Sequence, residues 1–256
     1  MSNLAIPAAL IHAIRAARRV VVLTGAGISA ESGVPTFRDA QTGLWAQYSP
    51  EELATPDAFQ RNPKLVWDWY AWRRELVRNT EPNPGHRALV DMEQRVPTFT
   101  LITQNVDGLH RRAGSRGVLE LHGNLFRTKC LAEDIVVKTW EDSGETPPRC
   151  PRCGAWLRPD VVWFGEALPA AVLAEAEAAT AQCEVFLSIG TSALVYPAAE
   201  LPFMALGRGA TVVEINPQPT PLSRHASFNL RNAAGDVLPQ LITAVWEDKE
   251  LRRPRD

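Results

Sequence analysis

The chain has little net charge and no long hydrophobic run. Its 27 Lys and Arg residues nearly balance 29 Asp and Glu residues, which leaves a formal net charge of −2. This balance gives no overall attraction to nucleic acid or to an acidic membrane, so we expect no direct nucleic-acid binding. No apolar run approaches the roughly 20 residues that a bilayer-spanning helix needs, so we also expect no membrane insertion.

Cysteine is scarce, which excludes a disulfide-rich scaffold. Three of the four cysteines (Cys130, Cys150 and Cys153) fall in one short stretch, at a spacing that indicates metal binding. Cys183 precedes an apolar run, where a buried small side chain is the simplest interpretation. The Arg-containing start resembles a transit peptide, but it continues without a linker into an apolar run. We therefore interpret it as part of the fold and expect a cytoplasmic protein.

Short apolar runs alternate with longer segments of helical periodicity. The predicted helices are Leu4–Arg19, Pro63–Arg78, Gly85–Arg95 and Ala170–Ala181, and the predicted strands are Val20–Leu23, Thr98–Thr103, Val118–Leu121, Val185–Ile189 and Thr211–Ile215. This alternation is typical of an α/β fold with a Rossmann-like parallel sheet and helices on both of its faces.

The segment Cys130–Pro159 differs from the rest, because it is polar and has no long periodic run. It indicates a small insertion held by a metal rather than by its own core. We expect one domain over residues 1–256. Its large Rossmann-like part covers about 1–35, 86–126 and 160–246, and its small part combines a helical insertion at about 36–85 with a zinc-ribbon-like module at about 127–159.

Glycines follow the first predicted strand in the run Gly25-Ala26-Gly27-Ile28-Ser29-Ala30. Such a run lets backbone N–H groups approach a pyrophosphate, although a tight strand-to-helix turn explains it equally well. The polar segments 25–39, 104–107, 190–192 and 216 all follow strands. In parallel sheets ligands bind outside the carboxyl ends of the strands, so these segments should meet in one crevice.

The run Gly25–Asp39 (GAGISAESGVPTFRD) closely resembles the cofactor-binding loop of sirtuins, which remove acyl groups from protein lysines and consume NAD. Four further matches follow in the family's order: Gln104–Asp107, Leu121–Gly123, Val162–Glu166 and Gly190–Ser192. The resemblance implies NAD as co-substrate and acyl-lysine proteins or peptides as partners. The products would be nicotinamide, acyl-ADP-ribose and free lysine.

The resemblance also implies residue roles. The implied cofactor-binding residues are Gly25, Ala26, Gly27 and Ser29 at the pyrophosphate, Phe37 and Arg38 over the nicotinamide ribose, Gln104, Asn105 and Asp107 at the nicotinamide, and Gly190, Thr191, Ser192, Asn216 and Ala234 at the adenosine. Burying a neutral amide requires paired donors and acceptors, which Asn and Asp side chains supply.

His122 is the candidate catalytic base, because imidazole titrates near neutral pH. Asn105 and Asp107 are the other candidate catalytic residues. A lone His at a strand end is otherwise a structural residue, and it is the Leu-His-Gly motif that favours catalysis. The segment with Val162, Trp163, Phe164 and Gly165 resembles the part of sirtuins that pairs with the substrate peptide as an added strand. A core strand is the alternative.

The metal pattern departs from the four cysteines of a zinc ribbon. Cys150-Pro151-Arg152-Cys153 is a complete C-x-x-C, whereas the other half is Cys130-Leu131-Ala132-Glu133. A carboxylate can bind zinc, but three cysteines and one glutamate are an unusual structural site. Asp134 is a neighbouring candidate. The sequence therefore leaves open a weaker zinc site with Glu133 or no metal at all.

The acyl specificity depends on one helix. Tyr70 and Arg73 share a helix face, where a guanidinium and a phenol can hold a carboxylate. An Arg on a helix face is otherwise solvated or paired with an acid. The Tyr-x-x-Arg pattern, together with Ala54, resembles the sirtuin branch that removes succinyl, malonyl and glutaryl groups. The alternatives are a general deacetylase, an ADP-ribosyltransferase, a non-catalytic NAD sensor and a dehydrogenase.

Overall fold

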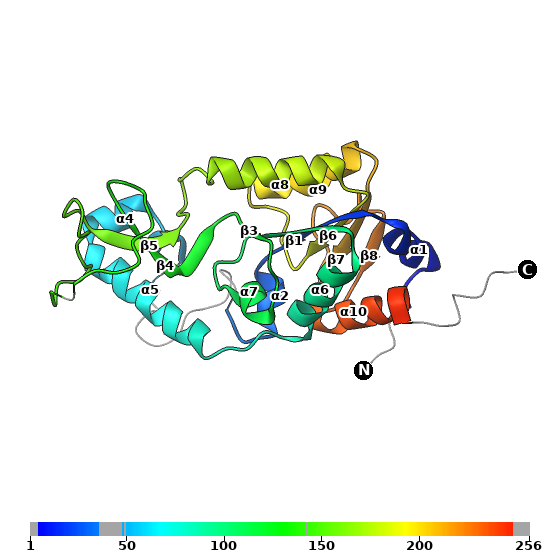
Figure 1. Cartoon of the computed structure of the whole chain (residues 1–256), viewed down its shortest axis with the longest axis horizontal. Helices are drawn as coiled ribbons and strands as arrows, with labels where there is room; N and C mark the ends of the chain where they lie inside the picture. The colour runs from blue at the N-terminus through cyan, green and yellow to red at the C-terminus, as the bar shows by residue number, and fades with distance from the viewer. Residues whose placement is uncertain (1–4, 36–47, 49, 142, 248–256) are drawn as a thin grey trace, which may run out of the picture.

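The computed structural model describes residues 5–35, 48, 50–141 and 143–247 (Figure 1). Phe37 and Arg38 lie outside the described residues. Within the described ranges, every helix is too short or too polar to span a bilayer.

A six-stranded parallel sheet forms the centre of the larger part, in the strand order β3-β2-β1-β6-β7-β8. The strands are β1 (Arg19–Thr24), β2 (Thr98–Thr103), β3 (Val118–Glu120), β6 (Val185–Ile189), β7 (Thr211–Ile215) and β8 (Phe228–Leu230). All neighbouring strands are parallel. The predicted Rossmann-like sheet is thus confirmed, and only β8 was absent from the prediction.

Helices cover both faces of this sheet, as predicted (Figure 1). The helices of this part are α1 (Ala8–Ala16), α2 (Ala26–Ala30), α6 (Pro84–Arg95), α7 (Leu109–Ala113), α8 (Ala170–Gln182), α9 (Leu201–Gly207) and α10 (Ala234–Ile242), with two short helical turns, η2 (Ala198–Glu200) and η3 (Thr243–Glu247). One core cluster joins the sheet to α1, α6 and α10, and another joins it to α8 and α9. Burial on both faces explains why most residues of these strands are apolar.

The smaller part lies at one end of the molecule (Figure 1) and has its own core. It contains α3 (Pro50–Leu53), α4 (Pro56–Arg61), α5 (Pro63–Arg78) and an antiparallel pair of strands, β4 (Gly123–Cys130) and β5 (Leu157–Val161). Strand β4 begins at Gly123, directly after His122. Gly123 has a φ of +81°, and a Cβ there would meet the Asp160 carbonyl oxygen at 2.1 Å. Only glycine allows this turn directly after His122.

Two predicted boundaries need correction. Helix α1 begins after Pro7 and ends at Ala16, so the prediction of a helix up to Arg19 is wrong. Arg19 is the first residue of β1. The alternative of a core strand over Val162–Gly165 is also wrong, because β5 ends at Val161.

Candidate functional site

The carboxyl ends of the central strands carry one connected set of polar side chains. The Gln104 side chain follows β2 and donates to the Thr191 hydroxyl after β6, at 3.0 Å. The Asn216 side chain follows β7 and donates to the Thr191 carbonyl oxygen at 2.8 Å. Three segments far apart in the sequence therefore meet at one edge of the sheet, as the strand-end pattern predicts.

A second set of hydrogen bonds joins the loop after β1 to the loop after β2. The Asn105 side chain donates to the Gly25 carbonyl oxygen at 3.0 Å and to the Ser29 hydroxyl at 3.1 Å. Ser29 in turn donates to an Asp107 carboxylate oxygen at 2.7 Å. All three side chains are buried. The amide nitrogen of Asn105 is thus used within the protein, and its carbonyl oxygen is the atom suited to receive a ligand's N–H.

Glycine is required where the loops after β1 and β6 pack on each other. Gly27 donates its N–H to the Gly190 carbonyl oxygen at 2.8 Å, and a Cβ on Gly27 would lie 2.7 Å from Gly190. Gly190 has a φ of +59°, and its own Cβ would meet the Ile28 nitrogen at 2.5 Å. These glycines serve loop-to-loop contact, which is a reason for them beyond a close approach to phosphate.

The other predicted cofactor residues lie in different surroundings. Ala26 opens the short helix α2, and Ser192 is half-buried in the loop after β6. Ala234 begins α10, but its side chain packs into the core, so any contact it makes with a ligand would be through its backbone.

His122 is half-buried at the entry to β4, and its ring orientation follows from one contact. Its Nδ1 lies 2.9 Å from the Gln104 carbonyl oxygen. A carbonyl only accepts, so Nδ1 carries the proton and Nε2 keeps a free lone pair. Burial lowers the pKa of His122, and the contact with Gln104 partly opposes this shift. At neutral pH the side chain is therefore an uncharged base.

Arg73 is half-buried on α5 and links two regions electrostatically. Burial lowers the pKa of Arg73, and its interactions with the Tyr70 hydroxyl and the Asp107 carboxylate oppose this shift. Burial raises the pKa of Asp107, and its hydrogen bonds and Arg73 counteract that effect. The guanidinium also lies 4.9 Å from the centre of the Trp69 ring. The Arg73 guanidinium therefore interacts electrostatically with both Tyr70 and the Asp107 carboxylate.

Three consecutive residues after β5 connect the catalytic candidate to the predicted acyl pocket. Val162 donates its N–H to the His122 carbonyl oxygen at 2.9 Å, and Phe164 donates to the Ala54 carbonyl oxygen at 2.9 Å. Between them, the indole N–H of Trp163 donates to the Tyr70 hydroxyl at 3.0 Å. The predicted residues of the acyl pocket are thus joined to His122 by one short segment.

These bonds also use the backbone N–H groups of this segment inside the protein. The N–H of Trp163 donates to the Glu166 carboxylate at 2.8 Å, so three successive N–H groups are used internally. The Trp163 side chain is buried, whereas Phe164 and Gly165 are exposed and line an open cavity with Thr55 and Arg61. Peptide binding by this segment stays a prediction, with carbonyl oxygens rather than these N–H groups as its hydrogen-bonding atoms.

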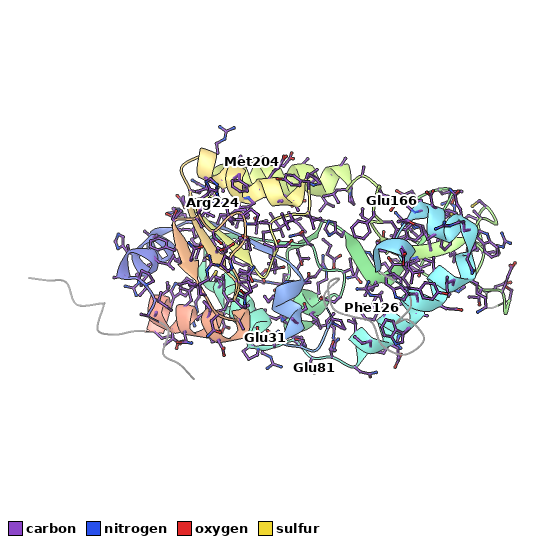
Figure 2. The ribbon with its side chains drawn as sticks, turned by 180° about the vertical axis from the view of Figure 1, so that it is seen from behind. Glu31, Glu81, Phe126, Glu166, Met204 and Arg224 are labelled. Carbon is purple, nitrogen blue, oxygen red and sulfur yellow. The ribbon has the colours of Figure 1, made fainter. Side chains whose placement is uncertain are left out.

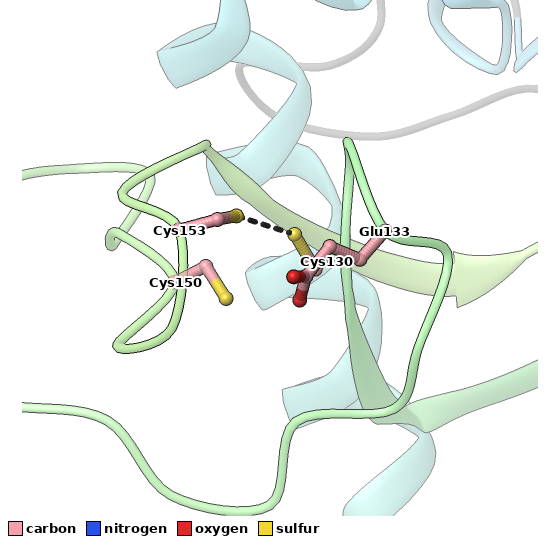
Figure 3. Close-up of side chains that lie close together, drawn as sticks. All are labelled: Cys130, Glu133, Cys150 and Cys153. Atoms are coloured by element: carbon pink, nitrogen blue, oxygen red, sulfur yellow. Dashed lines mark hydrogen bonds between the residues drawn. The ribbon is translucent and has the colours of Figure 1, made fainter.

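The predicted metal ligands converge (Figure 3). One ligand atom from each of Cys130, Glu133, Cys150 and Cys153 lies within 4.8 Å of the others, and the Sγ atoms of Cys130 and Cys153 are 3.4 Å apart. Tetrahedral zinc with bonds of about 2.0–2.3 Å separates its ligands by roughly 3.3–3.8 Å, so the spacing suits this ion.

The two halves of the metal cluster are equivalent turns. Cys130 donates its N–H to the Ile135 carbonyl oxygen, as Cys150 does to that of Ala155. Each turn is closed by an N–H bond back to its first cysteine, from Asp134 in one half and from Gly154 in the other. Both of these closing residues have positive φ, 53° and 75°.

This equivalence places Glu133 where Cys153 stands in the other half. Glu133 also pairs with Arg152 at 3.3 Å. Asp134, the other candidate, instead forms an ion pair with Lys129 at 2.6 Å. Cys183 is buried in a core cluster away from this site, as predicted.

Comparison with known proteins agrees with this geometry. The profile of the Sir2 family matches residues 25–197. An NAD-dependent protein deacylase of Aquifex aeolicus is 52% identical over 231 residues, covering 89% of this chain and 95% of the relative. The chain belongs to the Sir2 family.

Solved sirtuin structures share the fold over nearly the whole chain. A Sir2 homologue in complex with NAD has a TM-score of 0.89 and 45% identity, with 96% of each chain covered. A Sir2 complex described with a p53 peptide and NAD+ has a TM-score of 0.81 and 31% identity, with 92% of this chain and 96% of that chain covered. The shared fold includes both the parallel sheet and the smaller part.

Some structural features beside these loops were not predicted from the sequence. Glu31 accepts a hydrogen bond from the Gly235 N–H at 2.7 Å and so ties the cofactor loop to α10, beside which it lies in Figure 2. Leu194, Val195 and Tyr196 are exposed directly after the loop that follows β6. The apolar run directly after Gly190-Thr191-Ser192 is the sequence pattern that could have predicted this exposed apolar segment.

Proposed function

We propose that this sirtuin removes acyl groups from protein lysines at the expense of NAD and prefers succinyl and malonyl to acetyl. The names of its relatives support NAD-dependent deacylation, because they cover almost the full chain at about 50% identity. The acyl preference rests on this chain's own side chains. Its substrates would be proteins or peptides that carry an acidic acyl-lysine.

The strand-end residues fit the nicotinamide half of NAD. Asn105 and Asp107 are buried and positioned by Ser29, so they offer fixed polar atoms for a neutral amide. When bound, NAD supplies the ribose to which the acyl group is transferred. The protein orients the reactants and transfers one proton.

His122 is the group that moves this proton. Its Nε2 lone pair is free, because Nδ1 is committed to the Gln104 carbonyl oxygen. The burial that lowers its pKa keeps it unprotonated at neutral pH, so it can take a proton from a ribose hydroxyl and later return it. Gln104 therefore has two roles: its backbone orients the base, and its side chain contacts Thr191.

The observation that carries the acyl preference is the buried Tyr70 hydroxyl beside the Arg73 charge. Both residues project from α5, and the Tyr70 side chain is 2% exposed. An acetyl group has no use for a cation and a phenol, whereas a carboxylate at the end of a longer acyl chain can pair with both. Ala54 is buried in the same cluster, and its small side chain leaves room for the longer chain.

A structural zinc ion is the second part of the proposal. Three thiols and one carboxylate form two equivalent turns around a common centre, and this donor set fits zinc. The ion would be held by Cys130, Cys150, Cys153 and Glu133. It would hold together a module whose own core is small.

Labelled NAD tests the chemistry and separates the two enzymatic alternatives. With a succinyl-lysine peptide, the label should appear in soluble succinyl-ADP-ribose, and one nicotinamide should form for each lysine freed. Label bound covalently to protein, without peptide turnover, would favour an ADP-ribosyltransferase. His122→Ala is the matched control, and it should slow product formation by at least about a hundredfold without abolishing NAD binding.

A further inference from the structure

The hydrogen bond between Trp163 and Tyr70 fixes the direction in which the phenol can donate. An indole N–H is only a donor, so the Tyr70 oxygen must be the acceptor in this 3.0 Å contact. The phenolic proton is then available for another acceptor. Burial raises the pKa of Tyr70 to about 12, and the phenol therefore keeps this proton over the working pH range.

Trp163 is itself held in place from several sides. Its side chain is 2% exposed, the Arg158 guanidinium lies 3.3 Å from its ring centre, and the Phe59 ring centre is 5.3 Å away. Arg158 is fixed by two bonds to Glu166, at 2.5 and 2.9 Å, and Glu166 also accepts the Trp163 backbone N–H. The indole N–H thus comes from a rigid support.

The polarity of this contact suits an anion. A carboxylate is only an acceptor, and it needs donors whose protons already point toward it. A phenol that already accepts an N–H bond becomes a stronger donor, because hydrogen bonds in a chain polarise one another. Trp163 donates to Tyr70, and Tyr70 can then donate to a ligand. This arrangement favours a ligand atom that accepts a hydrogen bond, such as a carboxylate oxygen, over one that donates.

We propose that Trp163 is a specificity-determining positioning residue whose indole N–H orients the Tyr70 hydroxyl toward the carboxylate of the acyl group. This inference rests on the proposed preference for acidic acyl groups. Trp163 acts through Tyr70 and does not take part in the bond-breaking steps. An acetyl substrate brings no carboxylate, so the oriented proton offers it no advantage.

The test is Trp163→Phe, which removes the donor and keeps an aromatic ring over Arg158. Rates are measured on one peptide that carries succinyl-lysine or acetyl-lysine. The ratio of the two kcat/KM values should fall about three- to tenfold, the usual effect of one hydrogen bond. Because the acyl carboxylate is remote from the reacting amide, the loss should lie in the KM of the succinyl peptide rather than in kcat.

Two further variants separate orientation from packing. Phe59→Leu loosens the packing around Trp163 but keeps the N–H, so it should leave the succinyl-to-acetyl ratio unchanged even if the melting temperature falls. In a Tyr70→Phe background, Trp163→Phe should not lower the ratio further, because the hydroxyl it orients is gone. If Trp163→Phe does not fold, the sulfur isostere of tryptophan, benzothienylalanine, placed at position 163 removes only the N–H.

The outcomes are distinct. A wild-type preference for succinyl that Trp163→Phe reduces, and that Phe59→Leu keeps, supports the inference. A wild-type preference that survives unchanged in Trp163→Phe or in the isostere overturns the inference and leaves the proposed function standing. A wild-type enzyme without succinyl preference refutes the acyl specificity and the role of Trp163 together.

Discussion

The Nδ1 atom of His122 lies 2.9 Å from the carbonyl oxygen of Gln104, and this contact determines which ring nitrogen can act as the base. Gln104 immediately follows β2, and His122 lies between β3 and β4. The His122 ring is therefore oriented by the same strand-end loop that leads into Asn105 and Asp107. The orientation of the His122 ring and the positions of Asn105 and Asp107 thus depend on the same loop after β2.

Replacing His122 by Ala should lower kcat by at least about a hundredfold, the usual contribution of a positioned general base. In the wild type, kcat/KM should fall on acidification, because protonation removes the lone pair. The pKa of His122 is lowered by burial, so this fall should begin below the ordinary histidine value of about 6.5. A steady-state pH profile checks this, and a loss of rate that begins well above pH 7 would contradict it.

Arg73→Met should lower succinyl turnover far more than acetyl turnover. One charge-assisted bidentate pair contributes about 1.5–3 kcal/mol, so the ratio of the two kcat/KM values should fall roughly ten- to hundredfold. Arg73→Lys should recover only part of it, since an ammonium lacks the planar pair of donors. Equal losses on both substrates would instead indicate that Arg73 serves as the counter-ion of Asp107.

Glu133 should act as the fourth zinc ligand. Glu133→Ala should weaken zinc retention against a chelator by at least about tenfold, and Glu133→Cys should strengthen it. The matched control is Asp134→Asn, since Asp134 pairs with Lys129 and an Asn tolerates its positive φ. Metal content and melting temperature are the readouts. Zinc retention that does not change in Glu133→Ala would remove Glu133 from the site.

Two buried histidines should make the protein sensitive to acid. Burial lowers the pKa of His86 to about 4 and that of His110 to about 3, and their ring centres are 4.8 Å apart. These values lie below the unfolded value of about 6.5, so their neutral forms stabilise the fold above pH 6.5. That contribution is lost as the pH falls toward 4, by up to about 1.4 kcal/mol per pH unit for each histidine.

The His86→Leu variant tests this acid sensitivity. Both ring nitrogens of His86 are buried without a hydrogen-bond partner among the described residues, so an apolar side chain of similar size should be tolerated at pH 7. The variant should remove the contribution of His86 to the pH dependence of the unfolding free energy between pH 4 and 6.5, which is up to about 1.4 kcal/mol per pH unit. Urea unfolding across this range measures it, and an unchanged dependence would contradict the account.

The sequence predicted the buried strands well because a parallel sheet covered on both faces requires short apolar runs. The predicted Val185–Ile189 strand agrees with β6 at both ends. Strand β4 was missed because it contains Asn124 and Thr128, which are buried through local hydrogen bonds and strand pairing rather than through apolar character. Helix α10 was hidden by Pro239 in its interior, which normally argues against a helix.

The sequence predicted candidate residues for the site but not the contacts between them. Motifs at the strand ends made Asn105 and His122 candidates, yet no pattern in the sequence could show that Trp163 reaches the Tyr70 hydroxyl across 93 positions. Likewise, Glu133 stood at cysteine spacing, but only the folded turns show that it lies opposite Cys153. Such contacts depend on how two parts of the chain pack, and local periodicity carries no information about that.

The most direct test of the proposed function compares kcat/KM for succinyl-lysine and acetyl-lysine in one peptide sequence, with and without NAD. We predict turnover that requires NAD and a clear preference for succinyl, since Tyr70 and Arg73 offer a hydroxyl and a cation to the acyl carboxylate. An equal or higher value for acetyl in the presence of NAD would contradict the acyl preference. Turnover of neither peptide would contradict the deacylase itself.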